Sequence, residues 1–338
     1  MSFKRLDPED FLISADSVTA GAWTGNVPTL TKFFTSSVQI AGASGNYYMS
    51  IYQTGSTLDE AEVQFNISFG NIDGLGSLLY DAGISGKSPS STVFGQFQNI
   101  VLGDENSNFI FGTTTPITQS FYAITVNRAR YKGNIFPGTL ELRLNSTSST
   151  RYLTDNSNDT NIVTFNEAGR VYQIVSGTNG NAFSGTGYTT NSGSYGLFLP
   201  DIGTILLNAS ALDLPFVSGG IGLNTSYASN TLANNPNKLY TAISGGANFK
   251  LNSQENVTSD YIFIRARNSE FNYSENPSFI SGSTGEVLYD DFINAPQTFI
   301  TTVGLYNDAN ELLAVAKLSK PLKKDFTKEA LIRVKLDF

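Results

Sequence analysis

The sequence predicts a mainly β protein, built of antiparallel sheets in sandwich-like domains with one or two short helices. Its composition favours strands and turns, because the 338 residues include 31 Gly, 24 Phe and 16 Tyr and only 15% are charged. Short stretches alternate apolar and polar residues, as in EVQFNIS at 62–68, which is typical of a strand with one buried face. Turn-forming residues separate these stretches.

The first element expected is a short helix at DPEDF, with Asp7 as its cap and Pro8 inside, or alternatively an extended arm. A three-turn helix near 89–102 has stronger signals, because Ser88 is an N-cap, Pro89 occupies the first helical position and Gly103 can end the helix. Its apolar face consists of Val93, Phe97 and either Ile100 or Val101.

Further strands are expected at 121–131, 139–145, 195–207 and 260–268. Pro137-Gly138 suits a type II turn between the first two of these strands, and Pro200-Asp201 suits a turn within the third. Residues 228–251 are expected to form a short helical or turn-rich connector. The chain is expected to end on a hairpin around Asn307–Asn310 and a final strand at 330–338. The apolar row proposed to anchor these last strands is Val303, Leu305, Leu313, Val315, Ile332, Val334, Leu336 and Phe338.

Four segments are predicted along the chain. Residues 1–60 are an N-terminal arm with the first strands, and 61–145 are a β domain that contains the helix near 89–102. Residues 146–235 are a loop-rich β domain or insertion, and 236–338 are a C-terminal β domain. The boundaries rest on the polar, Gly-rich stretch at about 146–194 and on the connector that follows it.

Composition excludes many classes of enzyme. The chain has no His and no Cys, so it cannot build a Ser-His-Asp triad, a thiolate nucleophile or a sulfur-ligated zinc site. Carboxylate pairs, lysine chemistry and oxygen-ligated Mg²⁺ or Ca²⁺ remain open. We predict no catalytic residues, no cofactor and no metal ligands.

The charge of the chain also limits its partners. A net charge of −8 and a pI near 4.7 argue against direct binding of nucleic acid, and no apolar run approaches the length of a membrane span. No cleavable secretion signal is expected at the start. Charge is unevenly distributed, because residues 317–338 carry seven Lys or Arg against three Asp or Glu. This basic end suits an acidic partner or an acidic surface on another copy of the chain.

Two regions are predicted to make assembly contacts. Lys320, Lys323, Lys324 and Lys328 are expected in a solvated connection, as a basic rim that binds an acidic partner. The N-terminal arm contains Phe3, Phe11, Leu12, Ile13 and the single tryptophan, Trp23. These apolar residues are too many for a free tail and are expected to dock on a neighbouring subunit or on the body of the chain.

Several motifs have a functional and a structural interpretation, and the structural one is preferred for each. Residues 155–161 partly match a calcium loop but lack the glycine and the final glutamate. Two acidic pairs could serve glycoside chemistry, namely Asp290-Asp291 and Asp308 with Glu311. Four arginines could line an anionic groove on strands or form cross-strand ion pairs with residues such as Glu141, namely Arg128, Arg130, Arg265 and Arg267. Tyrosines among Gly and Ser at 42–56 and 184–196 could contact carbohydrate or protein.

A resemblance covers nearly the whole chain. Stretches such as SPSSTVFGQFQNIVLG, VNRARYKGNIFPGTLEL, YGLFLPDIGTILLNASALD and IRARNSEFNYSENPSFI resemble virion structural proteins of large contractile-tailed bacteriophages, of the marine cyanophage type. The hairpin VGLYNDANELLAVA is similar to an IGLYD-x-x-G-x-LLAVA signature in the basal domains of tail-fibre and baseplate-associated proteins. Asn310 stands where that signature usually has glycine.

The resemblance implies a nonenzymatic virion component in the tail, baseplate or tail-fibre attachment region, assembled in the host cytoplasm. Its partners would be other virion proteins and copies of itself. A neck or head-decoration role is an alternative. A tail module that binds or cleaves a host surface glycan is another, which the Tyr-Gly-Ser segments and the acidic pairs would support.

Overall fold

The computed structural model describes residues 4–36, 48–78, 88–111, 117–146, 149–159, 163–183, 194–228, 234–274 and 276–337. The chain divides into two compact units: unit 1 consists of Met1–Ser17 and Asn256–Phe338, and unit 2 of Val18–Glu255. Strands account for 45% of the structure and helices for 17%, and the sheets are antiparallel, including a curled half-barrel. The predicted fold class is confirmed. Four short α-helices are described, where one or two were expected.

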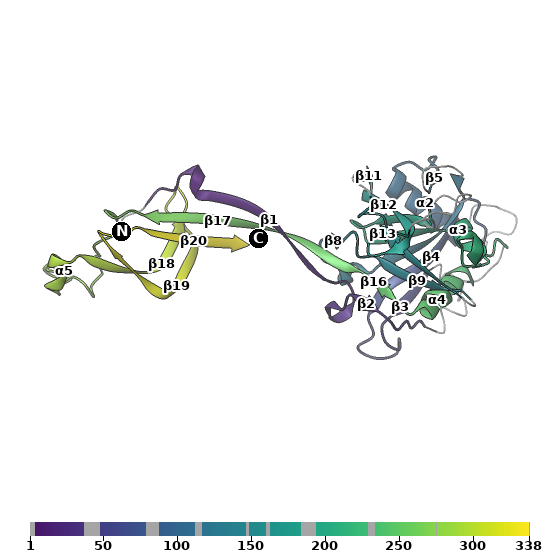
Figure 1. Cartoon of the computed structure of the whole chain (residues 1–338), viewed down its shortest axis with the longest axis horizontal. Coiled ribbons are helices and arrows are strands. Elements are labelled where there is room, and N and C mark those ends of the chain that lie inside the picture. Colours follow the sequence, from purple (N-terminus) through teal and green to yellow (C-terminus); the bar gives the residue numbers. More distant parts are fainter. Residues whose placement is uncertain are drawn as a thin grey trace. The chain divides into compact units, whose positions relative to one another are not determined.

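Unit 2 is built on one large antiparallel sheet (Figure 1). In the order of their hydrogen bonding, its strands are β2 (Thr29–Leu30), β16 (Phe249–Lys250), β9 (Glu141–Asn145), β10 (Thr150–Asp155), β12 (Gly169–Thr178), β14 (Gly196–Leu199), β15 (Thr204–Asn208), β7 (Ser120–Val126), β4 (Val63–Asn71) and β3 (Tyr48–Tyr52). The short strands β11 (Thr164–Asn166) and β13 (Asn181–Ala182) also pair with β12. Two further short strands, β5 (Phe109–Ile110) and β6 (Ile117–Thr118), pair with each other.

The central strand β7 shows why this sheet is covered on both faces. Its sequence SFYAITV is apolar at almost every position, which indicates burial on both sides. Tyr122 and Ile124 belong to one hydrophobic core, together with residues of β4, β9 and the helix α4 (Asn234–Gly246). Phe121 and Ala123 belong to a second core beneath the helix α2 (Pro89–Leu102). The sheet thus separates two cores within unit 2.

Helix α2 confirms the sequence signals. Ser88 accepts a hydrogen bond from the Ser91 backbone N–H, Pro89 is the first helical residue, and Gly103 closes the helix with a left-handed φ of 70°. Val93, Phe94, Phe97 and Val101 are buried, whereas Ile100 faces solvent. The expected helical connector is α4, with Leu239, Ala242 and Ile243 buried. A shorter helix, α3 (Ala209–Asp213), follows β15.

Unit 1 contains two small groups of strands. In one, β17 (Asn252–Ala266) lies between β1 (Phe11–Gly21) and β20 (Ala330–Asp337), and the parts of β1 and β17 that belong to unit 1 are 11–17 and 256–266. The first residues of β17 pair instead with the short strand β8 (Asn134–Ile135). In the other group, β18 (Gln297–Tyr306) pairs with β19 (Leu312–Asp325). The helix α5 (Asp291–Asn294) precedes β18, and the single 3-10 turn η1 (Pro8–Asp10) at DPEDF precedes β1. A small core joins the two groups of strands. Its members are Ile262, Ile332 and Val334, with Leu6, Ile264, Ile300, Val303, Leu305, Ala316, Leu318 and Leu336 packed against them.

The predicted apolar row of the C-terminal strands is partly wrong. Leu313 and Val315 are 68% and 58% exposed, because the inward positions of β19 are the small residues Ala314 and Ala316. These alanines pair with Leu305 and Val303, which do face the core. Phe3 and Phe338 lie outside the described residues.

The conformation of the C-terminal hairpin loop explains why asparagine is accommodated at position 310, where the similar signature usually has glycine. Asn307 N–H donates to the Glu311 carbonyl at 3.1 Å, and Asn310 N–H donates to the Asn307 carbonyl at 3.0 Å. Asn310 has a φ of 60°, a conformation that asparagine tolerates better than most residues other than glycine. The loop is therefore a type I turn followed by a left-handed residue, a common hairpin connection of this length.

Two expectations about chain organisation differ from the structure. Arg128 and Arg130 do not lie on a strand, because β7 ends at Val126 and the 3-10 turn η3 (Arg128–Arg130) follows. The sequence-based boundary at 145 separates β9 from β10, which pair directly. Unit 2 is a single body that extends across the boundaries at 60, 145 and 235, because strands from all four predicted segments contribute to its large sheet.

Candidate functional site

Trp23 lies in the core of unit 2. Its side chain is 2% exposed, and its indole nitrogen donates a hydrogen bond to the Phe249 carbonyl at 2.8 Å. The ring centroids of Phe249 and Phe65 lie 4.9 and 5.9 Å from that of Trp23. Trp23 therefore docks on the body of its own chain, one of the two sites expected. The prediction that Trp23 makes an assembly contact is corrected, because this side chain has almost no exposed surface to offer a partner.

The predicted lysine rim lies mainly on a strand rather than in a connection. Lys320, Lys323 and Lys324 belong to β19, and Lys328 follows it. Lys320, Lys323 and Lys328 are exposed, as expected. Lys324 is fully buried, so the expectation that its charge is solvated is wrong.

The ammonium group of Lys324 is held by three oxygen atoms. Its Nζ donates to the Asn268 carbonyl at 3.1 Å, to Asn272 Oδ1 at 2.9 Å and to the Asp325 carbonyl at 2.9 Å. An ammonium has three donors, so each of them has a partner. The neighbouring Thr298 hydroxyl donates to the Phe271 carbonyl at 2.5 Å. Lys324 therefore fastens the segment after β17 to the hairpin and is not free to bind a partner.

Unit 1 has a small core and a large exposed apolar surface. Among the described residues, five hydrophobic side chains of this unit are buried: Ile262, Ala266, Ala330, Ile332 and Val334. Sixteen large hydrophobic side chains of the same unit are exposed: Phe11, Leu12, Ile13, Tyr273, Val287, Leu288, Tyr289, Ile293, Phe299, Tyr306, Leu312, Leu313, Val315, Leu322, Phe326 and Leu331. Unit 1 thus exposes more large apolar side chains than its core contains.

Unit 2 has an open pocket with a volume of about 560 Å³ on one face of its sheet, lined by both polar and apolar side chains. Its floor includes Asn66 on β4 and Thr125 on β7, which are directly paired across the two strands. Thr125 shares its strand face with Phe121 and Ala123, so the pocket lies on the same face of the sheet as α2. Its walls come from the turn after β7, with Asn127, Arg128 and Tyr131, and from the β14–β15 turn, with Asp201 and Ile202.

The charged groups at this pocket are mostly held by neighbours. Arg170 Nη2 lies 2.5 Å from Asp201 Oδ1. Burial alone would raise the pKa of Asp201, but hydrogen bonds and the charge of Arg170 outweigh it and hold that pKa below its ordinary value. Arg128 lies over the Tyr131 ring at 4.7 Å, and burial raises the pKa of the Tyr131 hydroxyl. The Asn66 Oδ1 atom is buried and has no hydrogen-bond partner among the described residues.

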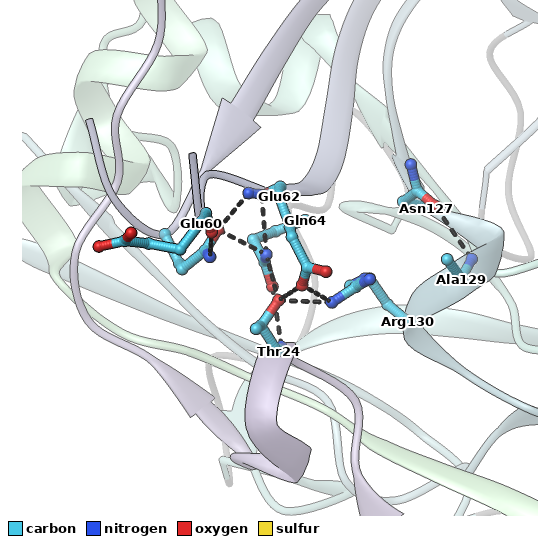
Figure 2. Close-up of polar contacts among 8 residues, drawn as sticks. Thr24, Glu60, Glu62, Gln64, Asn127, Ala129 and Arg130 are labelled. Atoms are coloured by element: carbon cyan, nitrogen blue, oxygen red, sulfur yellow. Dashed lines mark hydrogen bonds and ion pairs between the residues drawn. The ribbon is translucent and has the colours of Figure 1, made fainter. Parts of the chain in front are cut away.

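A hydrogen-bonded network fixes the turn that forms one wall of this pocket (Figure 2). Arg130 Nη1 lies 2.6 Å from Glu62 Oε2, and the Thr24 hydroxyl donates to the same oxygen at 2.7 Å. The fully buried Gln64 donates to Thr24 Oγ1 at 2.7 Å and accepts from the Thr24 N–H at 3.1 Å. Hydrogen bonds from Thr24 and Arg130 hold the pKa of Glu62 below its ordinary value. Figure 2 shows Thr24 and Arg130 pointing toward Glu62 from separate segments.

The carboxylates singled out from the sequence have structural contacts. Asp155 is buried and accepts hydrogen bonds from the N–H groups of Gly138 and Ser157, while burial raises its pKa. Asp290 and Asp291 are exposed at the start of α5. Glu311 accepts a hydrogen bond from Asn307 Nδ2 at 2.8 Å in the hairpin loop that also contains Asp308.

Two of the charged residues singled out from the sequence form ion pairs within the described residues. Arg265 pairs with Glu329 at 2.9 Å, and Glu141 pairs with Arg143 of its own strand at 2.7 Å, not with a distant arginine.

Two other motifs lie partly outside the described residues: residues 160–161 of the calcium-like loop, and most of the Tyr-Gly-Ser segments, at 42–47 and 184–193. Within the described residues, no group of three or more acidic side chains is placed to hold a metal ion.

Sequence reasoning missed the pocket. Asn66 and Thr125 occupy the polar positions of otherwise apolar strands, and this pattern marks them only as one face of a sheet.

None of the described helices combines the length and apolar character needed to cross a membrane. The chain matches no family model, no curated protein and no solved structure.

Proposed function

We propose that the chain is a nonenzymatic structural protein of a contractile-tailed bacteriophage particle, in the tail, baseplate or tail-fibre attachment region. Its task there is to make protein–protein contacts through unit 1. The resemblance of the VGLYNDANELLAVA hairpin to tail-fibre and baseplate-associated proteins motivates the location.

The exposed apolar surface of unit 1 is the observation on which this proposal rests. Five buried hydrophobic residues stand against sixteen exposed large ones among the described residues of the unit. Large apolar side chains that lie together on a surface favour its association with a protein partner. The hairpin β18–β19 contributes Phe299, Leu312, Leu313 and Val315 to this surface.

Electron microscopy of intact particles tests the proposed location. Particles would be labelled with an antibody raised against the chain, and the density would be assigned by cryo-electron microscopy. Label at the tail, baseplate or fibre attachment sites is the expected result. Label confined to the capsid shell, or its absence from purified particles, would refute the proposal.

The pocket of unit 2 supports a second candidate function, the binding of a surface glycan. Amides, a hydroxyl and a carboxylate line it, as Asn66, Asn127, Thr125 and Asp201, and such groups suit the hydroxyls of a saccharide. Among the described residues that line the pocket, Asp201 is the one carboxylate, and it is paired with Arg170. We therefore favour binding over glycoside cleavage at this pocket.

A glycan array followed by calorimetry tests the second function. Thr125→Val removes one pocket hydroxyl while keeping the shape of the side chain, and should weaken binding about tenfold if that hydroxyl contacts the ligand. Thr164→Val, on the exposed strand β11, is the control and should bind as the unaltered chain does. If no glycan on the array bound, or if Thr125→Val and Thr164→Val bound the glycan equally well, glycan binding at this pocket would be refuted.

A further inference from the structure

The strand β1 is exposed on both of its faces. Of its residues Phe11–Gly21, only Ser14 and Gly21 are even partly buried, and Ile13 is 71% exposed. β1 is also an edge strand, since it stands at the end of the order β1-β17-β20. An apolar edge strand without cover is a template for association, and proteins usually protect such edges.

The segment around β1 is acidic. Residues 7–16 include four carboxylates and no Lys or Arg, namely Asp7, Glu9, Asp10 and Asp16. All four are exposed or only partly buried. This segment, 7–16, therefore presents Phe11, Leu12 and Ile13 between negative charges.

The outer face of the hairpin β18–β19 is apolar and basic. Val315 is paired with Gly304, and Lys317 with Thr302, on the face opposite to the unit's core. The side chains of Tyr306 and Leu312 lie next to the Gly304 backbone, and Phe299 is paired with the exposed Lys323. This outer face thus combines exposed Phe299, Leu312 and Val315 with the charges of Lys317 and Lys323.

The two surfaces are complementary in charge and share an apolar centre, yet both are exposed within one chain. They therefore do not cover each other in the single chain. We infer that segment 7–16 of one copy binds the outer face of the β18–β19 hairpin of a second copy. The inference rests on the proposed function for the nature of the partner, because it makes self-association part of the assembly. The contact joins two different surfaces, so repeated copies would close into a ring or continue as an open chain.

Charge reversal on each surface, followed by mixing, tests this contact. One variant combines Glu9→Lys with Asp16→Lys, and the other combines Lys317→Glu with Lys323→Glu. Lys324 is left unchanged because it is buried. Each variant alone brings like charges together and should associate about tenfold more weakly than the unaltered chain, whereas an equimolar mixture should recover association. Analytical ultracentrifugation of the full chain measures the mass, and circular dichroism verifies that each variant is folded.

The outcomes separate the inference from the proposed function. A monomeric unaltered chain at all soluble concentrations would overturn self-association, and so would unchanged association of both variants. Failure of the mixture to recover association would overturn the pairing of these two surfaces. Binding of segment 7–16 to a different virion protein by a monomeric chain would also overturn the second copy as partner. None of these results alters the location found by labelling particles, which tests the proposed function separately.

Discussion

The indole nitrogen of Trp23 and the carbonyl oxygen of Phe249 are 2.8 Å apart, although 226 positions separate them in the sequence. This bond joins the first residues of unit 2 to the strand β16 near its end. A buried carbonyl that loses its donor costs about 1–3 kcal/mol. The bond therefore helps to close unit 2 between its two ends.

Trp23 fluorescence should report the folding of unit 2 in the unassembled protein. The emission should already be blue-shifted in the isolated chain, since the indole is buried, and should shift to longer wavelength as urea unfolds unit 2. Trp23→Phe should lower the stability of unit 2 by about 1–3 kcal/mol, because the Phe249 carbonyl loses its donor. A circular-dichroism denaturation curve measures this variant, which has no tryptophan. Water-like emission from the native isolated chain would contradict the burial of Trp23.

Lys324→Met should destabilise unit 1. The substitution keeps most of the apolar stem and removes the ammonium group, so the carbonyls of Asn268 and Asp325 and the Asn272 Oδ1 lose their donor. Hydrogen bonds to a charged group contribute about 1.5–3 kcal/mol each, although replacement by an apolar side chain recovers part of the loss. Hydrogen exchange of the β17 and β20 amides measures the effect in unit 1 specifically.

Lys323→Met is the matched control for this substitution. Lys323 is adjacent in sequence but exposed, and exposed substitutions typically change stability by no more than about 0.5 kcal/mol. Equal exchange rates in the two variants would show that the buried ammonium group has no structural role.

Asn310→Gly should preserve the hairpin loop, whereas Asn310→Val should destabilise it. Asn310 has a φ of 60°, which glycine adopts freely and a β-branched residue adopts at a cost of about 1–2 kcal/mol. Thermal unfolding of both variants, compared with the unaltered chain, measures the difference. A valine variant as stable as the glycine variant would mean that the loop has another conformation in solution.

Glu62→Gln should reduce stability at neutral pH and have a smaller effect in acid. Hydrogen bonds from Thr24 and Arg130 lower the pKa of Glu62 below its ordinary value of 4.5. The ionised carboxylate therefore stabilises the folded state above the unfolded pKa, and this contribution is lost as pH falls through the lower, folded pKa. Urea unfolding curves between neutral and acidic pH should converge for the two proteins. If the difference in unfolding free energy between the two proteins stayed constant across this pH range, a folded-state pKa shift at Glu62 would be excluded.

Elements whose conformation depends on residues close together in the sequence could be predicted from short sequence patterns. The capping Ser88, Pro89 and Gly103 defined α2, and the alternation in EVQFNIS predicted the strand that contains the buried Phe65 and Ile67. Backbone capping and strand alternation act over a few residues, so a short window of sequence contains the information.

Other features depended on packing between distant segments. The run Leu312–Ala316 is apolar at every position, so alternation could not show that Ala314 and Ala316 face the core while Leu313 and Val315 face out. The burial of Lys324 depends on acceptors from residues 268–272, more than fifty positions away. The pocket of unit 2 likewise combines the β4 and β7 strands with the β14–β15 turn.

Unit 1 is built from two segments at opposite ends of the sequence, and this has a consequence for biosynthesis. Met1–Ser17 is made before unit 2, but its partners in Asn256–Phe338 are made only after the whole of Val18–Glu255. At translation rates of about 5–20 residues per second, the wait is on the order of ten seconds or more. During that time the apolar strand residues Phe11, Leu12 and Ile13 have no β17 to pair with, and unit 2 itself cannot close until β16, near its end, has been made. Nascent chains on one message therefore expose this strand to each other, and premature contact between them must be avoided or reversed before unit 1 closes.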